Sequence, residues 1–169
     1  MKKQLLFIVA AAALVLTACD KDGETTNSSD RALAKATGVF TCDVSKELLS
    51  VAEVSIVTPS GKEVKFTESD HSVSLTEDYT EFPFTGKIVL KQALRSDAMP
   101  DSDKEYDLGY SWTAKITSLD KDGGIINFGE KESTEELAYK GANLKDYFSE
   151  NGEEVLLTFS VDKNGKIIQ

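Results

Sequence analysis

The regular alternation of apolar and polar residues is the feature that most constrains the fold of this chain. From Tyr106 to Ile116 every second residue is aromatic or aliphatic, and polar or small residues stand between them. Successive side chains of a strand point to opposite sides of a sheet, so this spacing predicts a strand that buries one face. Residues 82–94 show the same preference for one parity. We expect these two segments to form the backbone of an antiparallel sheet that is packed on one side.

Shorter alternating segments cover most of the remaining chain. They are residues 40–44, 54–56, 64–66, 73–75, 125–128 and 155–161, followed by a last short strand from Ile167. Turn signals such as Pro59-Ser60-Gly61 and Asn164-Gly165 separate them. About eight or nine strands at intervals of roughly ten residues predict an all-β, antiparallel, Ig-like β-sandwich, with an open β-barrel as the alternative. Residues 132–149 break the alternation and are expected to form a short helical connection.

The composition excludes several classes of protein. The chain has 169 residues, with 19 Lys and Arg against 29 Asp and Glu, and its formal net charge of -10 argues against nucleic acid as a partner. One His and two Cys are too few for a His-rich or Cys-rich metal cluster or for a disulfide scaffold. Hydrophobic residues make up 40% of the chain, which is enough for one packed domain.

The N-terminus has the organisation of a secretory signal. Lys2 and Lys3 precede an unbroken apolar run from Leu5 to Leu16. A helix of this length spans about 18 Å, whereas the hydrocarbon core of a membrane is about 30 Å thick. The run is therefore too short for a membrane span, and we interpret residues 1–18 as a signal peptide.

The sequence Leu16-Thr17-Ala18-Cys19 resembles a bacterial lipobox. The resemblance implies that Cys19 carries diacylglycerol on its sulfur and becomes the first residue of the mature protein. The acidic residues 20–24 resemble the surface-export signal of lipoproteins in Bacteroidetes-type bacteria. We expect residues 19–36 to be the lipidated Cys followed by a disordered polar tether, and residues 37–169 to be the β-sandwich domain.

Taken together, the lipobox, the acidic stretch, the polar tether and the Asp-Lys-Asx-Gly turns between strands resemble the small, single-domain lipoproteins of Bacteroidetes-type bacteria. This resemblance implies attachment to the outer membrane through the N-terminal lipid, with the domain on the cell surface. It carries over no functional residue beyond Cys19.

Nothing in the sequence has the pattern of a catalytic centre, and we expect the protein not to be an enzyme. Cys42 shares a strand face with Phe40 and Val44, which predicts a buried and inert thiol. His71, the one imidazole, reads as a turn residue between two strands. The motif Gly-x-Ser-x-Gly is absent from the chain.

The loop from Ser96 to Lys104 carries several carboxylates close together. They are Asp97, Asp101 and Asp103, with Glu105 beside the loop. Clustered carboxylates repel one another unless a cation or water separates them, so a Ca²⁺ site is one interpretation. A solvated loop without a metal or other cofactor is the alternative.

Three residues are candidates for contact with a ligand. A platform for sugars needs flat rings on a polar strand face or in a loop, and Tyr79 and Tyr139 are the tyrosines available there. Met99 lies in the middle of the acidic loop, where an apolar side chain could contact a protein partner.

These features support one main hypothesis and two alternatives. A sandwich without a catalytic pattern on a flexible lipid anchor suggests a non-enzymatic binding or adhesion module, with a glycan or a protein as ligand. The first alternative is an envelope structural or pilus-like assembly subunit that adds a strand to a neighbour. The second is an enzyme or enzyme inhibitor that uses loop carboxylates.

Overall fold

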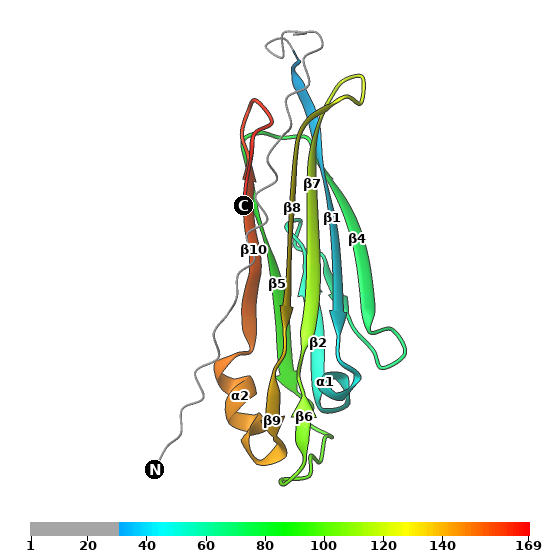
Figure 1. Cartoon of the computed structure of the whole chain (residues 1–169), viewed down its shortest axis with the longest axis vertical. Coiled ribbons are helices and arrows are strands. Elements are labelled where there is room, and N and C mark those ends of the chain that lie inside the picture. The colour runs from blue at the N-terminus through cyan, green and yellow to red at the C-terminus, as the bar shows by residue number, and fades with distance from the viewer. Residues whose placement is uncertain (1–30) are drawn as a thin grey trace, which may run out of the picture. The chain divides into compact units, whose positions relative to one another are not determined.

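The computed structural model describes residues 31–169, which form two antiparallel sheets packed face to face (Figure 1). The four-stranded sheet has the order β4-β1-β7-β8. Its strands are β1 (Leu33–Val44), β4 (Ser72–Tyr79), β7 (Tyr110–Asp120) and β8 (Ile125–Glu135). The five-stranded sheet has the order β11-β10-β5-β2-β3. Its strands are β2 (Ala52–Val57), β3 (Glu63–Lys65), β5 (Phe84–Leu94), β10 (Glu153–Val161) and β11 (Ile167–Ile168).

Short elements close one end of the sandwich. A two-stranded ribbon pairs β6 (Glu105–Asp107) with β9 (Ala138–Lys140). The helix α1 (Lys46–Val51) joins β1 to β2, and its first turn is capped by the Ser45 hydroxyl, which accepts a hydrogen bond from the backbone NH of Leu48 at 3.0 Å. A 3₁₀ turn (Gly141–Asn143) leads into α2 (Leu144–Glu150). Within the described residues, no helix is long and apolar enough to cross a membrane.

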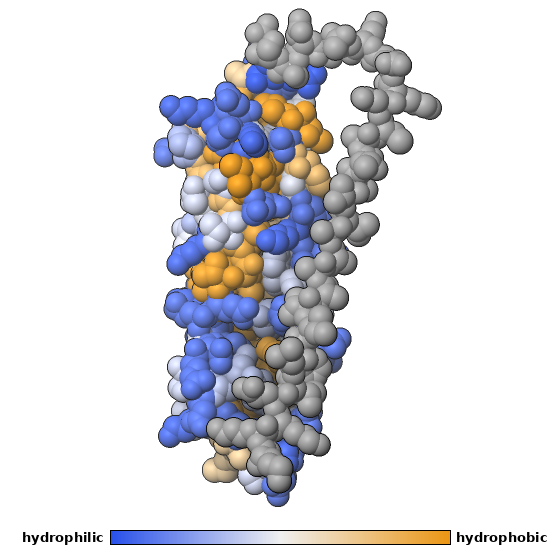
Figure 2. All heavy atoms as spheres, turned by 60° about the vertical axis from the view of Figure 1, so that its left-hand side comes forward, coloured by the Kyte–Doolittle hydropathy of each residue, from blue (hydrophilic) through white to orange (hydrophobic). Residues whose placement is uncertain are grey.

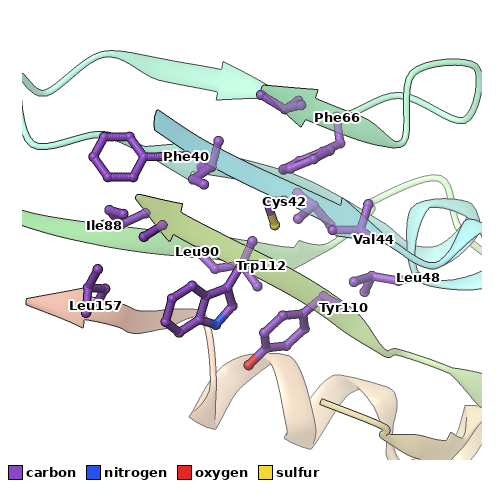
Figure 3. Close-up of a cluster of buried hydrophobic side chains, with 14 of the residues drawn as sticks. Phe40, Cys42, Val44, Leu48, Phe66, Ile88, Leu90, Tyr110, Trp112 and Leu157 are labelled. Atoms are coloured by element: carbon purple, nitrogen blue, oxygen red, sulfur yellow. The ribbon is translucent and has the colours of Figure 1, made fainter. Parts of the chain in front are cut away.

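The core lies between the two sheets and consists of the side chains on their inner faces. Phe40 on β1 and Ile116 on β7 face Leu90 on β5 and Phe159 on β10, and each is almost completely buried. Figure 3 shows part of this cluster, with side chains from both sheets directed toward one another. Burial of such a side chain contributes roughly 1.5–3 kcal/mol, so the alternation of residues along each strand is the main source of stability.

The structure confirms the predicted all-β sandwich, and the two sheets remain separate rather than closing into the open barrel of the alternative. The prediction for the two long alternating segments was wrong in one respect. β5 and β7 do not share a sheet, because β5 pairs with β2 and β10 whereas β7 pairs with β1 and β8. Alternation shows that a strand buries one face, but it does not show which strand lies beside it.

The expected helical connection at 132–149 is also too long at its N-terminal end. Residues up to Glu135 belong to β8, and the 3₁₀ turn and α2 begin only at Gly141. β8 is an edge strand in which no residue is buried, so both of its faces are rich in polar residues and the alternation disappears.

The domain begins earlier than predicted, because β1 starts at Leu33 and includes residues 33–36, which we expected in the tether. The inner positions at this end of β1 are small. Ala36 is completely buried, and a Cβ on Gly38 would lie 2.5 Å from the ring of Phe40. The absence of bulky apolar residues hid the alternation here. The predicted signal peptide 1–18, the lipidated Cys19 and the tether up to residue 30 lie outside the described residues.

The carboxylate of Glu77 joins the two sheets at one edge of the sandwich. It accepts hydrogen bonds from the hydroxyls of Thr58 and Ser60, from the backbone NH of Ser60 at 3.3 Å and from the Tyr79 hydroxyl at 2.9 Å. Burial raises the pKa of Glu77, but these hydrogen bonds outweigh burial and lower the pKa overall. Glu77 belongs to β4 in one sheet and Thr58 follows β2 in the other, so this carboxylate fastens the sheets together.

We expect replacement of Glu77 by Ala to lower the free energy of unfolding by about 1–3 kcal/mol, because it leaves several half-buried donors without their acceptor. Urea denaturation followed by tryptophan fluorescence measures the change. Thr76→Ala, on an exposed position of the same strand, is the matched control and should change stability by about 0.5 kcal/mol or less. Equal stability of Glu77→Ala and the wild type would contradict this role.

The stability difference between the wild type and Glu77→Gln should also depend on pH. The pKa of Glu77 is lower in the folded chain than the ordinary value of 4.5 for a glutamate, so the ionised carboxylate stabilises the fold above this value. This contribution is lost as the pH falls through the lowered pKa. Denaturation curves at several pH values should therefore converge for the two proteins in acid, and a constant difference would contradict the prediction.

Candidate functional site

A cleft of about 790 Å³ opens on the surface of residues 31–169. It lies where α1, β2, the turn after β3 and the segment after β5 come together. Its walls are formed by Leu49, Ala52, Glu53, Val54, Lys65, Phe66, Thr67, Glu68, Ser69, Arg95, Ser96 and Asp97. A volume of this size is typical of small-molecule sites, which occupy about 300–1,000 Å³. We refer to it as the α1 cleft.

Core residues form the floor of the α1 cleft. Leu49, Val54 and Phe66 line it and are buried in the hydrophobic core. Phe66 follows the short strand β3, and its backbone NH donates a hydrogen bond to the carbonyl of Val54 at 2.9 Å. This bond holds the turn after β3 against β2. The floor is therefore attached to the sheet and is in place before any ligand binds.

Charged side chains surround this floor, and Arg95 is the most strongly held of them. Its Nε and Nη2 atoms donate to the two oxygens of Asp97 at 3.0 and 2.9 Å, and its Nη1 lies 3.7 Å from Glu68. The hydrogen bonds and charge of Arg95 lower the pKa of Asp97, and Asp97 in turn raises the pKa of Arg95. Lys65 and Glu53 form a second, looser pair at 3.8 Å.

Hydroxyl groups complete the lining. Thr67, Ser69 and Ser96 contribute one each, and the hydroxyl oxygens of Thr67 and Ser69 are 3.2 Å apart. The turn that carries the first two is closed by reciprocal backbone hydrogen bonds between Thr67 and Asp70. The cleft thus presents hydrogen-bond donors and acceptors of both charges above an apolar floor. This combination suits binding of a polar ligand, and its lining includes neither His nor Cys to act as a nucleophile or base.

The four predicted calcium ligands do not come together as a site. Asp97 is bound to Arg95 at the α1 cleft, and Asp101 Oδ1 accepts the backbone NH of Asp103 at 3.0 Å. Glu105 lies in the ribbon opposite Lys140. Among residues 31–169, no group of three or more His, Cys, Asp or Glu side chains is placed to hold a metal ion. Asp97 instead has an arginine as its counter-charge, which removes the need for a cation there.

The predicted ligand-binding residues also lie in three separate places. Tyr79 is buried, stacks on Phe84 with ring centroids 4.2 Å apart and donates its hydroxyl to Glu77. The half-buried ring of Tyr139 packs on Tyr147 at 4.4 Å. Because Tyr79 is buried and stacked on Phe84, it has no free face for a sugar, and the prediction of Tyr79 as a ligand-binding residue was wrong. Met99 is 97% exposed, as a contact residue would be.

Cys42 has the buried environment that the alternation predicts. It is a free thiol with no exposed surface, and it lies among Phe66, Val44 and Leu90 in the core (Figure 3). Burial, with a smaller contribution from the charge of Asp43, raises the pKa of this thiol to about 12. A thiol with this pKa carries almost no thiolate at neutral pH and is a poor nucleophile.

Sequence reasoning found Asp97 but missed the other residues of the α1 cleft. The pair Arg95 and Asp97 stands two residues apart at the end of a predicted strand, and this local charge pair was the available signal. Lys65 is the last residue of β3 and Glu68 lies in the turn after it, and both are distant in sequence from Arg95. Their position beside Arg95 depends on the pairing of β2 with both β3 and β5.

The fold and the cleft together define residues 31–169 as a β-sandwich domain with a preformed polar cleft beside α1. Comparison with protein-family models, with curated proteins and with solved structures found no match. The functional argument therefore depends on the geometry of this chain alone.

We expect Cys42 to be unreactive in the folded protein. In a Cys19→Ser variant, where Cys42 is the one remaining thiol, Ellman's reagent at pH 8 should give no colour until denaturant is added. With a pKa of about 12, about one thiol in ten thousand is ionised at this pH, and burial blocks access to it. Rapid reaction of the native protein would contradict the description of Cys42 as a core residue.

Proposed function

We propose that this protein is a non-enzymatic binding module of the outer cell envelope, anchored by lipid on Cys19, which binds its ligand in the α1 cleft. The observation that carries the proposal is the cleft itself, because it combines a fixed apolar floor with a rim of paired charges and hydroxyls. Sites for small ligands typically have this construction. The buried, protonated state of Cys42 supports a role without nucleophilic catalysis.

The lining favours a ligand rich in hydroxyl groups, such as a glycan chain. Carboxylates, the Arg95 guanidinium and the hydroxyls of Thr67 and Ser69 supply acceptors and donors at short intervals around the cleft. Each charged group is already partnered, so a neutral ligand can bind without leaving a charge unpaired. A glycan fits this requirement better than a free anion or cation does.

The anchor and the location rest on the N-terminal residues. The lipobox-like sequence ending in Cys19 supports thioether linkage to a lipid, and multiple acyl chains hold a protein stably on a membrane. Because the chain is acidic, anionic head groups repel the domain, which leaves its cleft accessible away from the bilayer. The acidic residues 20–24 support display on the outer cell surface.

Glycan arrays test the ligand directly. We expect the protein to bind a defined subset of glycans, and Arg95→Gln to weaken this binding by about ten-fold because it removes a charged hydrogen-bond donor from the cleft. Lys35→Gln is the matched control, because Lys35 forms an equally short ion pair with Asp78 at 3.0 Å on the other sheet. An array without any bound glycan, or equal binding by Arg95→Gln and the wild type, would contradict the proposal.

Metabolic labelling with a radioactive fatty acid tests the anchor. We expect label in the wild type and in Cys42→Ala, and none in Cys19→Ser, because the lipid requires a sulfur at position 19. In the same cells, Cys19→Ser should leave the membrane fraction. A labelled, membrane-bound Cys19→Ser protein would show that the anchor lies elsewhere.

A further inference from the structure

The two long edges of the sandwich differ. At the edge formed by β3 and β4, Glu77 joins the sheets by accepting hydrogen bonds from Thr58 and Ser60, and every exposed residue of β4 is polar. At the opposite edge, β8 and β10 are the outer long strands, and β11 pairs only with Ser160 and Val161 of β10. Residues 153–159 of β10 therefore have β5 on one side and, within residues 31–169, no strand on the other. We call this outer rim of β10 the open edge.

Exposed apolar side chains gather around the open edge. Five large hydrophobic residues are exposed in the described part of the chain, and four of them lie on β8, β10 and β11. They are Ile125, Phe128, Val155 and Ile168. Figure 2 brings this side of the sandwich forward and shows hydrophobic patches on it between hydrophilic ones. Such a concentration at one edge indicates a contact surface, because scattered exposure would be ordinary.

β8 and β10 are not equally suited to pairing with another strand. β8 carries Lys131 opposite Ala114 of β7, where its side chain is exposed, and a charged residue on an edge strand is a common protection against pairing. The segment Val155-Leu156-Leu157-Thr158-Phe159 of β10 contains no charge, no Pro and no Gly. It has the composition of segments that readily pair with an added strand. A register shift between Val155 and Leu157 is its one irregularity.

β11 shows that a strand can pair with β10 on this edge. It runs antiparallel to β10. It also packs closely on β8, because a Cβ atom added to Gly129 of β8 would lie only 3.1 Å from the Cγ2 atom of Ile167. A longer strand on the same line would continue past Ser160 and pair with Phe159, Leu157 and Val155 in turn. Its backbone would satisfy the NH and carbonyl groups that β10 directs away from β5.

The negative charge at the N-terminal end of β10 indicates which kind of strand would bind to the open edge. β8 and β10 together carry five Glu and one Lys, and Glu153 and Glu154 stand at the start of β10. The carboxylate of Glu153 lies 3.6 Å from the ammonium group of Lys91, and Glu154 accepts a hydrogen bond from the Tyr110 hydroxyl, so the acidic charge at this end is only partly compensated. A strand that continues the line of β11 reaches these two residues with its C-terminal part. Lys or Arg there would complement them. A second copy of the chain fits less well, because two molecules with a formal charge of -10 repel each other.

We propose that the open edge of β10 binds an extended segment of another protein, which adds to the five-stranded sheet as an antiparallel strand. The segment has apolar residues at alternate positions in its first part and Lys or Arg at its C-terminal end. Main-chain hydrogen bonds hold it, and the alternate side chains give specificity. This interaction uses a surface other than the α1 cleft, so it does not depend on the proposed glycan ligand.

A synthetic peptide tests the proposal on the full chain. The probe is a fluorescein-labelled peptide of about nine residues that alternates Val and Thr and ends in three Lys. We expect saturable binding by fluorescence anisotropy, weakened by salt because the terminal contacts are ionic. The same peptide ending in three Glu should bind about ten-fold more weakly or not at all.

Two variants of matched type locate the site. Val155→Lys introduces a charge at a residue that is 52% exposed, so the fold should be retained, and it should weaken binding about ten-fold. Thr76→Lys introduces the same charge on β4, the edge strand at the other side, and should leave binding unchanged. Cooperative thermal unfolding of both variants confirms that they are folded. With the peptide bound, backbone amides of residues 153–159 should gain protection from hydrogen exchange.

Four results would overturn the proposal. They are the absence of binding by the lysine peptide, equal binding by Val155→Lys and the wild type, equal binding of the Lys and Glu peptides, and protection of β4 in place of β10. Sedimentation measurements give a further outcome. A dimer of the full chain that Val155→Lys dissociates would assign the open edge to a second copy and not to a separate partner. Loss of glycan binding in Arg95→Gln with peptide binding retained would leave this inference intact.

Discussion

Burial of the inner faces of two sheets is the interaction on which the rest of this structure depends. The largest buried side chains, among them Phe40, Ile116 and Phe159, come from strands of both sheets and meet in one cluster. Each strand contributes through the alternation of its residues, so the sandwich forms without a disulfide in its described part. The α1 cleft is a consequence of this packing, because its floor consists of core residues and its rim of the turns that the two sheets hold in place.

The two sheets of the sandwich have four edge strands, whose unpaired backbone groups could pair with other chains. The four edges of the described residues are protected to different degrees. The five-stranded sheet ends in the very short strands β3 and β11, which limits the exposed hydrogen-bonding rim. The exposed residues of β4 are polar and Glu77 of β4 is hydrogen-bonded to Thr58 and Ser60, which follow β2 of the other sheet, while β8 carries the exposed charge of Lys131. Residues 155–159 of β10 contain no charge and no Pro, and a register shift between Val155 and Leu157 is the one irregularity along this rim. Among the edges of residues 31–169, this difference is the basis of the proposed strand binding at β10.

The sequence was sufficient to predict the class of fold, but it was not sufficient to predict which strands pair with one another. β7 and β10 were recognisable because one face of each is apolar and the other polar, and a half-buried strand requires this pattern. β8 was not fully recognised because an edge strand can be polar on both faces. The first residues of β1 were missed because Ala36 and Gly38 are small enough to pack under Phe40 and Tyr79. In each case the missing information was the identity of the neighbouring strand.

The same limit applies to the candidate site. Asp97 could be selected from the sequence as a loop carboxylate, but its partner Arg95 makes it part of a cleft rim and not a cation ligand. Tyr79 looked available for a ligand because its strand was predicted to end before it, whereas the structure places it inside the core beside Glu77. Long-range pairing of strands decides both outcomes, and one sequence contains no direct signal for it.

Hydrogen exchange of individual backbone amides in the free protein tests most directly whether the outer rim of β10 is unpaired while the inner strands are protected. The account predicts that amides of β1 and β7 exchange only through global unfolding, while the amides within residues 155–159 that point away from β5 exchange almost as fast as in an unfolded chain. Strong protection of those β10 amides would mean that another part of the chain already covers this rim, and the account of an open edge would be wrong.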